Sequence, residues 1–263
     1  MSGTSGPSGM SGTSVLRAEG VGVRFGGVRA LDGVGLRLAA GEVCGLIGPN
    51  GAGKTTLFDV LSGIRRPDAG RVLLDGAEVT RRSPVWRARH GMRRTFQRRQ
   101  LFGQLTVADN LLVAQESRRG GADAGRAAEL LRACGLEALS GTYAGTLPVG
   151  QARMVELARA AADRPRVLLL DEPASGMTAD ERERLAAVVR VLAADGCAVL
   201  LVEHNVAFVM ELCSRVVVLD LGRVLAEGTP AEVRADARVR EAYLGTRDPA
   251  RTAPDAQGMR GRA

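Results

Sequence analysis

The sequence predicts an α/β protein in which helices cover both faces of a mostly parallel β-sheet. In the second half of the chain, short apolar runs alternate with longer segments of helical periodicity, which is the pattern of βα units. Earlier, the apolar run Glu42–Ile47 leads directly into a glycine-rich loop and a helical segment, as a buried parallel strand does. Hydrophobic residues make up 45% of the 263 residues and aromatic ones only 3%, so the chain can build one large domain with an aliphatic core.

The first hundred residues predict an antiparallel sheet beside the start of the parallel one. Val15–Phe25 and Gly33–Leu38 alternate in hydrophobicity, which favours an antiparallel hairpin or sheet edge. After the buried strand Glu42–Ile47, the segment Thr55–Ser62 continues as a helix. Two further elements are expected here, a strand at Arg71–Leu74 and a helix within Ser83–Gly91.

The middle of the chain is predicted to be helical and to form an inserted subdomain of about residues 98–162. Its expected helices are Val107–Gln115, Asp123–Cys134 and Gln151–Ala162. After it come an apolar strand over residues 167–170 and further α/β units. Their expected elements are helix Ala179–Ala194, strand Ala198–Glu203, helix Val206–Cys213 and strand Val216–Asp220.

Both ends of the chain are predicted to be disordered, which leaves residues 15–245 as the folded domain. Residues 1–14 are almost entirely Ser, Gly and Thr and lack the basic start and apolar run of a signal peptide. Residues 246–263 are rich in Arg, Ala and Pro. No stretch approaches the roughly 18–20 apolar residues that span a bilayer. We therefore expect a cytoplasmic protein that meets the membrane only through partners or its surface.

The charge and the cysteine content of the chain give little support to a basic binding patch, a zinc site or a disulfide framework. The net charge of +7 allows nucleic acid or an anionic membrane as partner, but the arginines are scattered among acids, as in Glu181–Arg184. A compositional origin is favoured over a functional basic patch. The four cysteines are widely spaced, without a C-x-x-C pair or a histidine cluster. They predict buried reduced thiols rather than a zinc site or disulfides.

Lys54 is the only lysine among the 36 basic residues, which indicates a position where a compact ammonium is needed and a planar guanidinium does not fit. It lies in a G-x-x-x-x-G-K-[ST] phosphate loop, whose backbone N–H groups and helix N-terminus bind phosphates. The lysine reaches the β/γ-phosphates, and the Thr55 hydroxyl coordinates Mg²⁺. The sequence therefore predicts binding of ATP or another nucleoside triphosphate. The expected contacts are Gly48, Pro49, Asn50, Gly51, Ala52, Gly53, Lys54, Thr55 and Thr56.

A pair of acids completes the nucleotide site. Asp171 and Glu172 follow an apolar strand, and ligands bind at the carboxyl ends of parallel strands. We expect Asp171 to hold the Mg²⁺ shell and Glu172 to act as the base for the water that attacks the γ-phosphate. An isolated Asp-Glu pair is more often a solvated turn, but the upstream phosphate loop favours the catalytic interpretation.

Six motifs between Phe25 and His204, taken in the order in which they occur along the chain, resemble those of the ATP-binding subunits of ATP-binding-cassette (ABC) transporters. The phosphate loop and the pair Asp171–Glu172 are two of them. The resemblance runs from about Val15 to Gly245 and implies a RecA-like P-loop NTPase core with an antiparallel β subdomain and an inserted α-helical subdomain. It assigns Phe25 to adenine stacking, although an ordinary strand aromatic is the alternative. It also assigns Gln97 to the glutamine loop that contacts Mg²⁺ or the attacking water, and His204 to the switch that reaches the γ-phosphate, although a core histidine is the alternative.

The same resemblance places a signature motif at Leu147–Gln151 and a dimer-contacting loop at Ser175–Thr178. Gly150 and Gln151 are intact, and they imply contact with nucleotide bound by a second ATPase subunit. Two residues depart from the family pattern. Pro148 replaces the signature serine and so cannot supply its hydroxyl, and Thr178 replaces an aspartate. Both departures concern how strongly the signature of this subunit supports ATP hydrolysis at the site of the partner subunit.

The flanking residues resemble one subgroup, the ATP-binding subunits of branched-chain, or hydrophobic, amino acid importers. The sequence segments that carry this resemblance are Arg24–Leu31, Arg94–Gln97, Leu101–Phe102, Leu105–Ala114 and Ala242–Gly245. The implied machine has two ATPase subunits, identical or not, beneath two membrane permeases that are supplied by an extracytoplasmic solute-binding protein. Other cargoes, such as urea, amides or lipids, remain alternatives, because this subunit has no cargo pocket. A non-transport cassette acting on nucleic acid or ribosomes is disfavoured, because the chain has neither a second cassette nor a base-stacking aromatic cluster.

The segment Gln97–Asn110 is predicted to face the permease. Leu101 and Phe102 combine apolar side chains with the neighbouring Arg98–Arg99, and an exposed apolar group rimmed by charge marks a partner site. The alternative is that both side chains pack inside the helical subdomain. His90 is expected to be an exposed helix residue.

Overall fold

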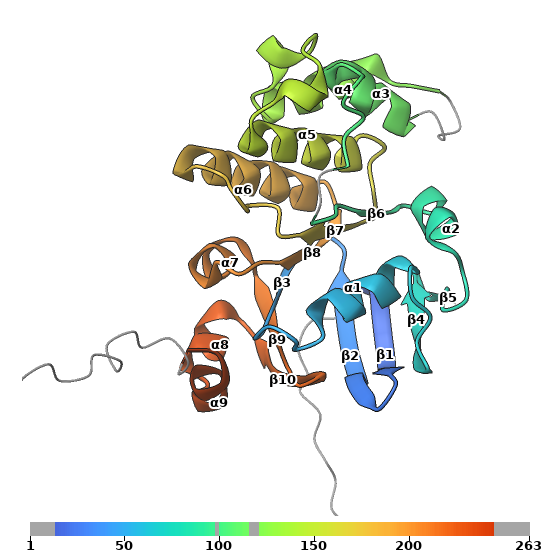
Figure 1. The fold of residues 1–263 in the computed structure, drawn as a ribbon, viewed down its shortest axis with the longest axis vertical. Coiled ribbons are helices and arrows are strands. Elements are labelled where there is room, and N and C mark those ends of the chain that lie inside the picture. The colour runs from blue at the N-terminus through green and yellow to red at the C-terminus, as the bar shows by residue number, and fades with distance from the viewer. Residues whose placement is uncertain (1–13, 98–99, 116–120, 245–263) are drawn as a thin grey trace, which may run out of the picture.

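The computed structural model describes residues 14–97, 100–115 and 121–244 (Figure 1). Most of the predicted leader, the whole predicted tail and the Arg98–Arg99 pair lie outside these residues. Ser14, which the sequence assigned to the leader, is the first residue of strand β1.

The predicted hairpin at the N-terminus is confirmed and belongs to a four-stranded antiparallel sheet in the order β2-β1-β4-β5. Strands β1 (Ser14–Phe25) and β2 (Val28–Ala39) pair antiparallel, followed by β4 (Ala69–Leu74) and β5 (Ala77–Glu78). Alternate residues of β1 and β2 are buried, from Leu16 in the first to Leu38 in the second. This alternation produced the sequence signal, because one face of the sheet is covered and the other is solvated.

The second sheet has six strands in the order β10-β9-β3-β8-β7-β6. All neighbouring pairs are parallel except β9–β10. The strands are β3 (Val43–Ile47), β6 (Met92–Arg94), β7 (Val167–Asp171), β8 (Ala198–Val202), β9 (Arg215–Asp220) and β10 (Arg223–Gly228). Every residue of β3, β7 and β8 is buried, as expected for central strands of a parallel sheet covered on both faces.

The two faces of this sheet are covered differently. Helices α6 (Ala179–Ala194) and α7 (Val206–Leu212) pack on the face that includes Ile47. Helix α1 (Lys54–Ser62) and the antiparallel sheet pack on the opposite face, with Leu46. The predicted helical cover is therefore confirmed on one face, while β-structure supplies much of the other.

The predicted helical segment forms a separate group above the sheets (Figure 1). It contains α3 (Val107–Gln115), α4 (Ala124–Ala133) and α5 (Val149–Ala161). Helix α5 begins two residues before the predicted start, with Pro148 at its N-cap. The other helices are α2 (Pro84–Arg89), α8 (Pro230–Ala235) and α9 (Ala237–Val239), with 3₁₀ turns at Glu137–Leu139 and Ala144–Thr146 and a π-helical turn at Arg240–Leu244.

Sequence reasoning missed β5, β6, β10, α8 and α9. Strand β6 has only three residues, and two of them are the arginines Arg93 and Arg94. The periodicity of such a short charged segment is too weak to distinguish a strand from a loop. This omission matters because β6 carries residues of the functional site.

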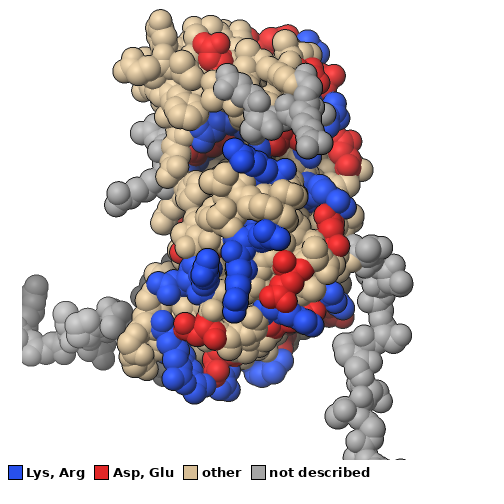
Figure 2. Space-filling view, turned by 90° about the vertical axis from the view of Figure 1, so that its right-hand side faces the viewer, with Lys and Arg blue, Asp and Glu red and all other residues tan. Residues whose placement is uncertain are grey.

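Three further predictions concern the cysteines, the surface and His90. All four cysteines are free and buried, as expected. On the face shown in Figure 2, basic and acidic side chains are interspersed. His90 is exposed at the end of α2, and the centre of its ring lies 3.6 Å from that of Trp86, on which it stacks.

None of the helices that the structure describes is long and apolar enough to cross a membrane.

Candidate functional site

The phosphate loop joins β3 to α1 and depends on backbone that only glycine tolerates. Gly53 caps α1 with φ 104°, and a Cβ there would lie 2.5 Å from the carbonyl oxygen of Ala30. A Cβ on Gly48, at φ 154°, would lie 2.1 Å from the carbonyl oxygen of Leu219. Because both contacts are with backbone, a side chain at either glycine would displace the loop from its neighbouring strands.

Lys54 is buried at the first position of α1. Its Nζ donates hydrogen bonds of 2.7 Å and 2.9 Å to the carbonyl oxygens of Gly48 and Pro49. Burial lowers the pKa of Lys54, while the charges of Glu172 and Asp171 act in the opposite direction. The carbonyl oxygens of the phosphate loop thus hold the Lys54 ammonium in place.

The loop forms one wall of a pocket of about 290 Å³. The predicted catalytic residues Gln97, Glu172 and His204 line the same pocket, so the structure brings them to the phosphate loop. The full lining is Ala30, Asn50, Gly51, Ala52, Gly53, Lys54, Thr55, Thr56, Gln97, Glu172, Val202 and His204.

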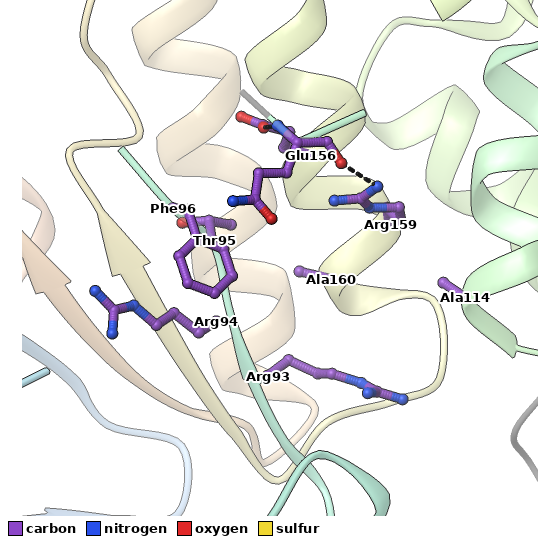
Figure 3. Close-up of a pocket in the computed structure, with 9 residues that line it drawn as sticks. Arg93, Arg94, Thr95, Phe96, Ala114, Glu156, Arg159 and Ala160 are labelled. Carbon is purple, nitrogen blue, oxygen red and sulfur yellow. Dashed lines mark hydrogen bonds between the residues drawn. The ribbon is translucent and has the colours of Figure 1, made fainter. Parts of the chain in front are cut away.

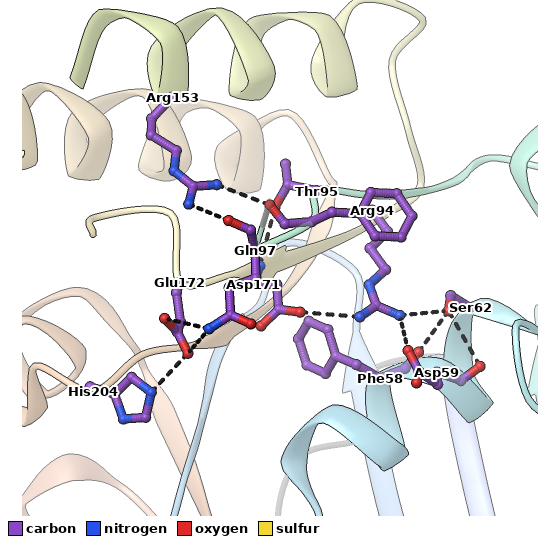
Figure 4. Close-up of polar contacts among 11 residues, drawn as sticks. Phe58, Asp59, Ser62, Arg94, Thr95, Gln97, Arg153, Asp171, Glu172 and His204 are labelled. Atoms are coloured by element: carbon purple, nitrogen blue, oxygen red, sulfur yellow. Dashed lines mark hydrogen bonds and ion pairs between the residues drawn. The ribbon is translucent and has the colours of Figure 1, made fainter. Parts of the chain in front are cut away.

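Glu172 lies between Gln97 and His204 and contacts both (Figure 4). Its carboxylate accepts hydrogen bonds from Gln97 Nε2, 3.3 Å from each oxygen, and His204 Nε2 lies 2.8 Å from Oε1. The backbone of Glu172 is left-handed, with φ 48°, and its N–H donates to the carbonyl oxygen of Val202. A non-glycine residue in this region costs about 1–3 kcal/mol and is found where surrounding structure enforces it, often at functional sites.

Asp171 is buried at the end of β7 and is not itself part of the pocket lining, although the next residue, Glu172, is. Its Oδ2 accepts a 3.1 Å hydrogen bond from Arg94 Nη2, and its N–H donates to Thr95 Oγ1. Burial raises the pKa of Asp171, and Arg94 opposes this. Sequence analysis assigned no role to Arg94 or Thr95, because the pairing of β6 with β7 creates both contacts.

Sequence analysis also missed two residues, Arg153 and Glu203, that hold the backbone of the site in place. Arg153, on α5, donates hydrogen bonds to the carbonyl oxygens of Phe96 (2.9 Å) and Gln97 (2.6 Å), and so ties the glutamine loop to the helical group. Glu203 is buried, and its carboxylate accepts the N–H groups of Ala174 and His204. Burial raises the pKa of Glu203, while these backbone bonds act against the rise. A charged residue directly after the apolar run Ala198–Val202 was the available signal for Glu203.

Five predicted nucleotide contacts lie outside the pocket lining: Gly48, Pro49, Phe25, Gly150 and Gln151. The first two belong to the phosphate loop itself. Phe25 has 47% of its surface exposed, and the guanidinium carbon of Arg65 lies 4.0 Å from the centre of its ring. Gly150 is buried in the first turn of α5, where a Cβ would lie 2.2 Å from the carboxylate of Glu181. Gln151 follows Gly150 in that turn. Within one subunit these residues do not complete the phosphate-loop pocket.

The two departures from the family pattern have different structural consequences. Pro148 is the N-cap residue of α5 and supplies no side-chain cap. Thr178 is the N-cap of α6 and forms a capping box with Glu181. Its hydroxyl accepts the N–H of Glu181, and the Glu181 carboxylate accepts the N–H of Thr178. Thr178 therefore supplies the cap for which aspartate is also well suited.

A second cavity, of about 150 Å³, lies between β6 and α5 beside the glutamine loop (Figure 3). Arg159 donates a 2.6 Å hydrogen bond to the carbonyl oxygen of Gln100, whose N–H donates to Glu156. Nearby, Phe102 is 51% exposed, while Leu101 is half-buried against the core. The prediction of an exposed apolar group is thus confirmed for Phe102, and the packing alternative holds for Leu101.

Comparison with known proteins identifies the family. Residues 31–175 match the family described as ABC transporter, and residues 223–249 match the one described as branched-chain amino acid ATP-binding cassette transporter. The chain belongs to the ABC transporter family. It is 39% identical to the high-affinity branched-chain amino acid transport ATP-binding protein BraF of Pseudomonas aeruginosa and 37% identical to LivG of Escherichia coli. Each alignment covers 88% of this chain and 98% of the relative.

Solved ABC cassettes share the fold. The ADP conformation of an ATP-binding cassette of an ABC transporter superposes with a TM-score of 0.80 at 31% identity, covering 88% of this chain and 99% of that chain. The predicted α/β fold of an ABC ATPase is therefore confirmed. The chain is an ATP-binding, ATP-hydrolysing subunit of an ABC transporter.

Proposed function

We propose that this ABC ATPase powers the import of branched-chain or other hydrophobic amino acids. The observation that carries this proposal is the match of residues 223–249 to the branched-chain amino acid cassettes. That segment includes β10, α8 and α9, outside the nucleotide pocket. Similarity there extends beyond what ATP binding alone requires. The near-complete overlap with BraF and LivG also supports it.

The phosphate loop binds the β- and γ-phosphates of ATP. Among the residues that the structure describes, the Lys54 ammonium donates its hydrogen bonds to carbonyl oxygens of its own loop. On binding, the ammonium exchanges a carbonyl partner for phosphate oxygens, while the loop N–H groups and the α1 dipole bind the same anion. Such phosphoryl transfer depends on positioning and charge stabilisation.

The site also fits Mg²⁺. The exposed Thr55 hydroxyl lines the pocket, and Asp171 has one carboxylate oxygen without a hydrogen-bond partner in the described part of the chain. With the amide oxygen of Gln97, these are the hard oxygen ligands that Mg²⁺ accepts alongside phosphates. When bound, the ion neutralises charge that develops on the phosphates.

Glu172 acts as the general base, and its two neighbours orient it. Its carboxylate lies in the pocket wall within hydrogen-bond reach of Gln97 and His204. It takes the proton of the water that attacks the γ-phosphate. Gln97 holds that carboxylate or water through its amide, and His204 directs its imidazole toward the γ-phosphate. Phe25 stacks on adenine at the edge of the site.

A second ATPase subunit, identical or not, completes the site. Gly150 and Gln151 lie off the phosphate-loop pocket of their own subunit, at the N-terminus of a helix without a side-chain cap. The free N–H groups of such a terminus favour an anion, here the γ-phosphate bound by the partner. Hydrolysis separates the two subunits and resets two membrane permeases, which a solute-binding protein supplies from outside the cell. The chain then lies on the cytoplasmic face of the membrane.

Phe102 and its surroundings form the permease-facing surface. The backbone of Phe102 is held at both ends by Asn110, whose side chain accepts its N–H and donates to its carbonyl oxygen. The exposed ring lies 5.5 Å from the guanidinium carbon of Arg159. A rigidly held, exposed aromatic ring beside charge suits a protein partner.

Co-purification from native membranes tests the proposed function. We expect a second ATPase subunit and two permeases, and cells that lack this chain should lose uptake of labelled leucine. Recovery of permeases for another cargo, with leucine uptake unchanged, would overturn the substrate assignment. Recovery with ribosomes or nucleic acid would overturn transport itself.

A further inference from the structure

Arg94 is a buried arginine placed between two carboxylates of the ATPase core (Figure 4). Only 8% of its side chain is exposed. One guanidinium nitrogen, Nη1, donates to Asp59 (2.6 Å) and to Ser62 (3.1 Å) on α1, and the other, Nη2, donates to Asp171 (3.1 Å). The side chain thus connects the helix of the phosphate loop to the end of β7.

The surroundings of Arg94 restrict its movement. Its guanidinium carbon lies 5.5 Å from the Phe58 ring centre and 5.0 Å from that of Phe96. Its Nε is buried without a hydrogen-bond partner among the described residues, so the group is held by its two terminal nitrogens and the flanking rings. A planar fork can bridge two carboxylates in this way, whereas a lysine ammonium cannot be divided between them with the same geometry.

We infer that Arg94 is the positioning residue for the carboxylate of Asp171. By binding Oδ2 it fixes the rotation of the carboxylate and leaves Oδ1 for the metal shell. The same guanidinium anchors this carboxylate to α1, whose first turn carries Thr55, so both proposed metal-site groups keep one relative position. This inference rests on the proposed metal role of Asp171. Partners that orient metal-site ligands typically change metal affinity or activity by about 10–100-fold.

The direct test is Arg94→Met, which keeps an unbranched apolar stem and removes the fork. Binding of a fluorescent ATP analogue is measured in EDTA and with saturating Mg²⁺, and Mn²⁺ affinity of the protein–nucleotide complex is measured by EPR. We expect affinity in EDTA within about 3-fold of wild type and Mn²⁺ affinity lower by about 10-fold or more. A folded variant with wild-type Mn²⁺ affinity would overturn the inference.

Arg93→Met is the matched control. Arg93 is the preceding residue of β6 and forms its own ion pair, with Asp163, so the variant removes one ion pair from the same strand without touching Asp171. Its Mn²⁺ affinity should equal that of wild type. An equal loss in both variants would assign the effect to β6 as a whole and contradict a specific role for Arg94.

Two further variants separate the possible failures. If Arg94→Met does not fold, Arg94→Lys retains the charge, and we expect Mn²⁺ affinity about 3-fold or more below wild type; an unchanged affinity would overturn the need for the fork. Asp171→Asn tests the metal role itself. If it leaves Mn²⁺ affinity unchanged, the proposed metal role fails; if it lowers Mn²⁺ affinity while Arg94→Met does not, only the inference about Arg94 fails.

Discussion

At the scale of single residues, Glu172 and Lys54 show how backbone and burial prepare side chains for ATP hydrolysis. Glu172 has a left-handed backbone, which directs its carboxylate toward Gln97 and His204. Lys54 is buried in the loop, with its ammonium bound to two carbonyl oxygens. In both residues the local geometry places the reactive group of the side chain, a carboxylate or an ammonium, at the phosphate pocket.

Glu172→Gln should leave ATP binding intact and lower hydrolysis by about 10²-fold or more, because the amide cannot take a proton from the attacking water. Both groups have the same shape, so the contact with Gln97 is kept in part. The measurement is ATP turnover together with size-exclusion chromatography in ATP, where we expect a trapped dimer. A variant that turns over within a few-fold of wild type would refute the base assignment.

Lys54→Arg should weaken nucleotide binding nearly as much as Lys54→Ala. The loop encloses one compact ammonium at 2.7–2.9 Å from two carbonyl oxygens, and a planar guanidinium is larger. Titration with a fluorescent ATP analogue measures this. Equal affinity of the arginine variant and wild type would show that charge alone suffices.

At the scale of elements, helices α5 and α6 differ in how their N-termini are capped. Helix α6 begins with a full capping box at Thr178 and Glu181, while α5 begins at Pro148 without a side-chain cap. A capped terminus is stable by itself, whereas an uncapped one retains free N–H groups for a ligand. This asymmetry supports the proposal that the partner's γ-phosphate binds at α5.

Thr178→Ala should destabilise the protein by about 1 kcal/mol through loss of the cap, which lowers Tm by about 2–4 °C for a domain of this size. Thr178→Asp preserves a capping oxygen and serves as the control. Its Tm should stay within about 1 °C of wild type in calorimetry. If both variants melt alike, the cap does not stabilise α6.

Phe102→Ala should uncouple transport from hydrolysis. The ring is half exposed, so its removal leaves the ATPase activity of the isolated subunit intact, while uptake into proteoliposomes falls. Val191→Ala, which truncates an exposed side chain on α6, is the control and should not change uptake. A large drop in Tm for Phe102→Ala would instead show that the ring is part of the core.

At the scale of the whole molecule, the aliphatic core determines how the protein responds to alkaline pH. Burial raises the pKa of Cys134, Cys197 and Cys213 to about 12, from an ordinary value of 9.0. The folded state thus holds these protons more tightly than the unfolded state. Between about pH 9 and 12, stability must fall as pH rises, because unfolding then releases protons.

Denaturant titrations at increasing pH should therefore show a declining free energy of unfolding above about pH 9. Cys197→Ala removes one of the titrating thiols, so its decline should be shallower than that of wild type. Native thiols should also resist labelling at mildly alkaline pH, since only the thiolate reacts. A slope unchanged by Cys197→Ala would exclude this thiol as a source of the pH dependence.

The sequence alone determined the features that depend on neighbouring residues. The phosphate loop Gly48–Thr55 and the pair Asp171–Glu172 are recognisable because their chemistry requires fixed residues at fixed spacing. Long elements with strong periodicity, such as α6, were also predicted with their bounds. The short charged strand β6 was not, because its position depends on pairing with β7.

Only the tertiary structure decided which distant residues meet. Arg94 and Asp171 are 77 residues apart, and Arg153 and Gln97 are 56 apart, so no local pattern could pair them. The tertiary structure also decided which motif residues line the pocket that holds Lys54, and it places Gly150 and Gln151 outside that lining. The physical reason is that residue spacing encodes local backbone geometry, whereas contacts between strands and helices depend on how the whole chain buries its apolar surface.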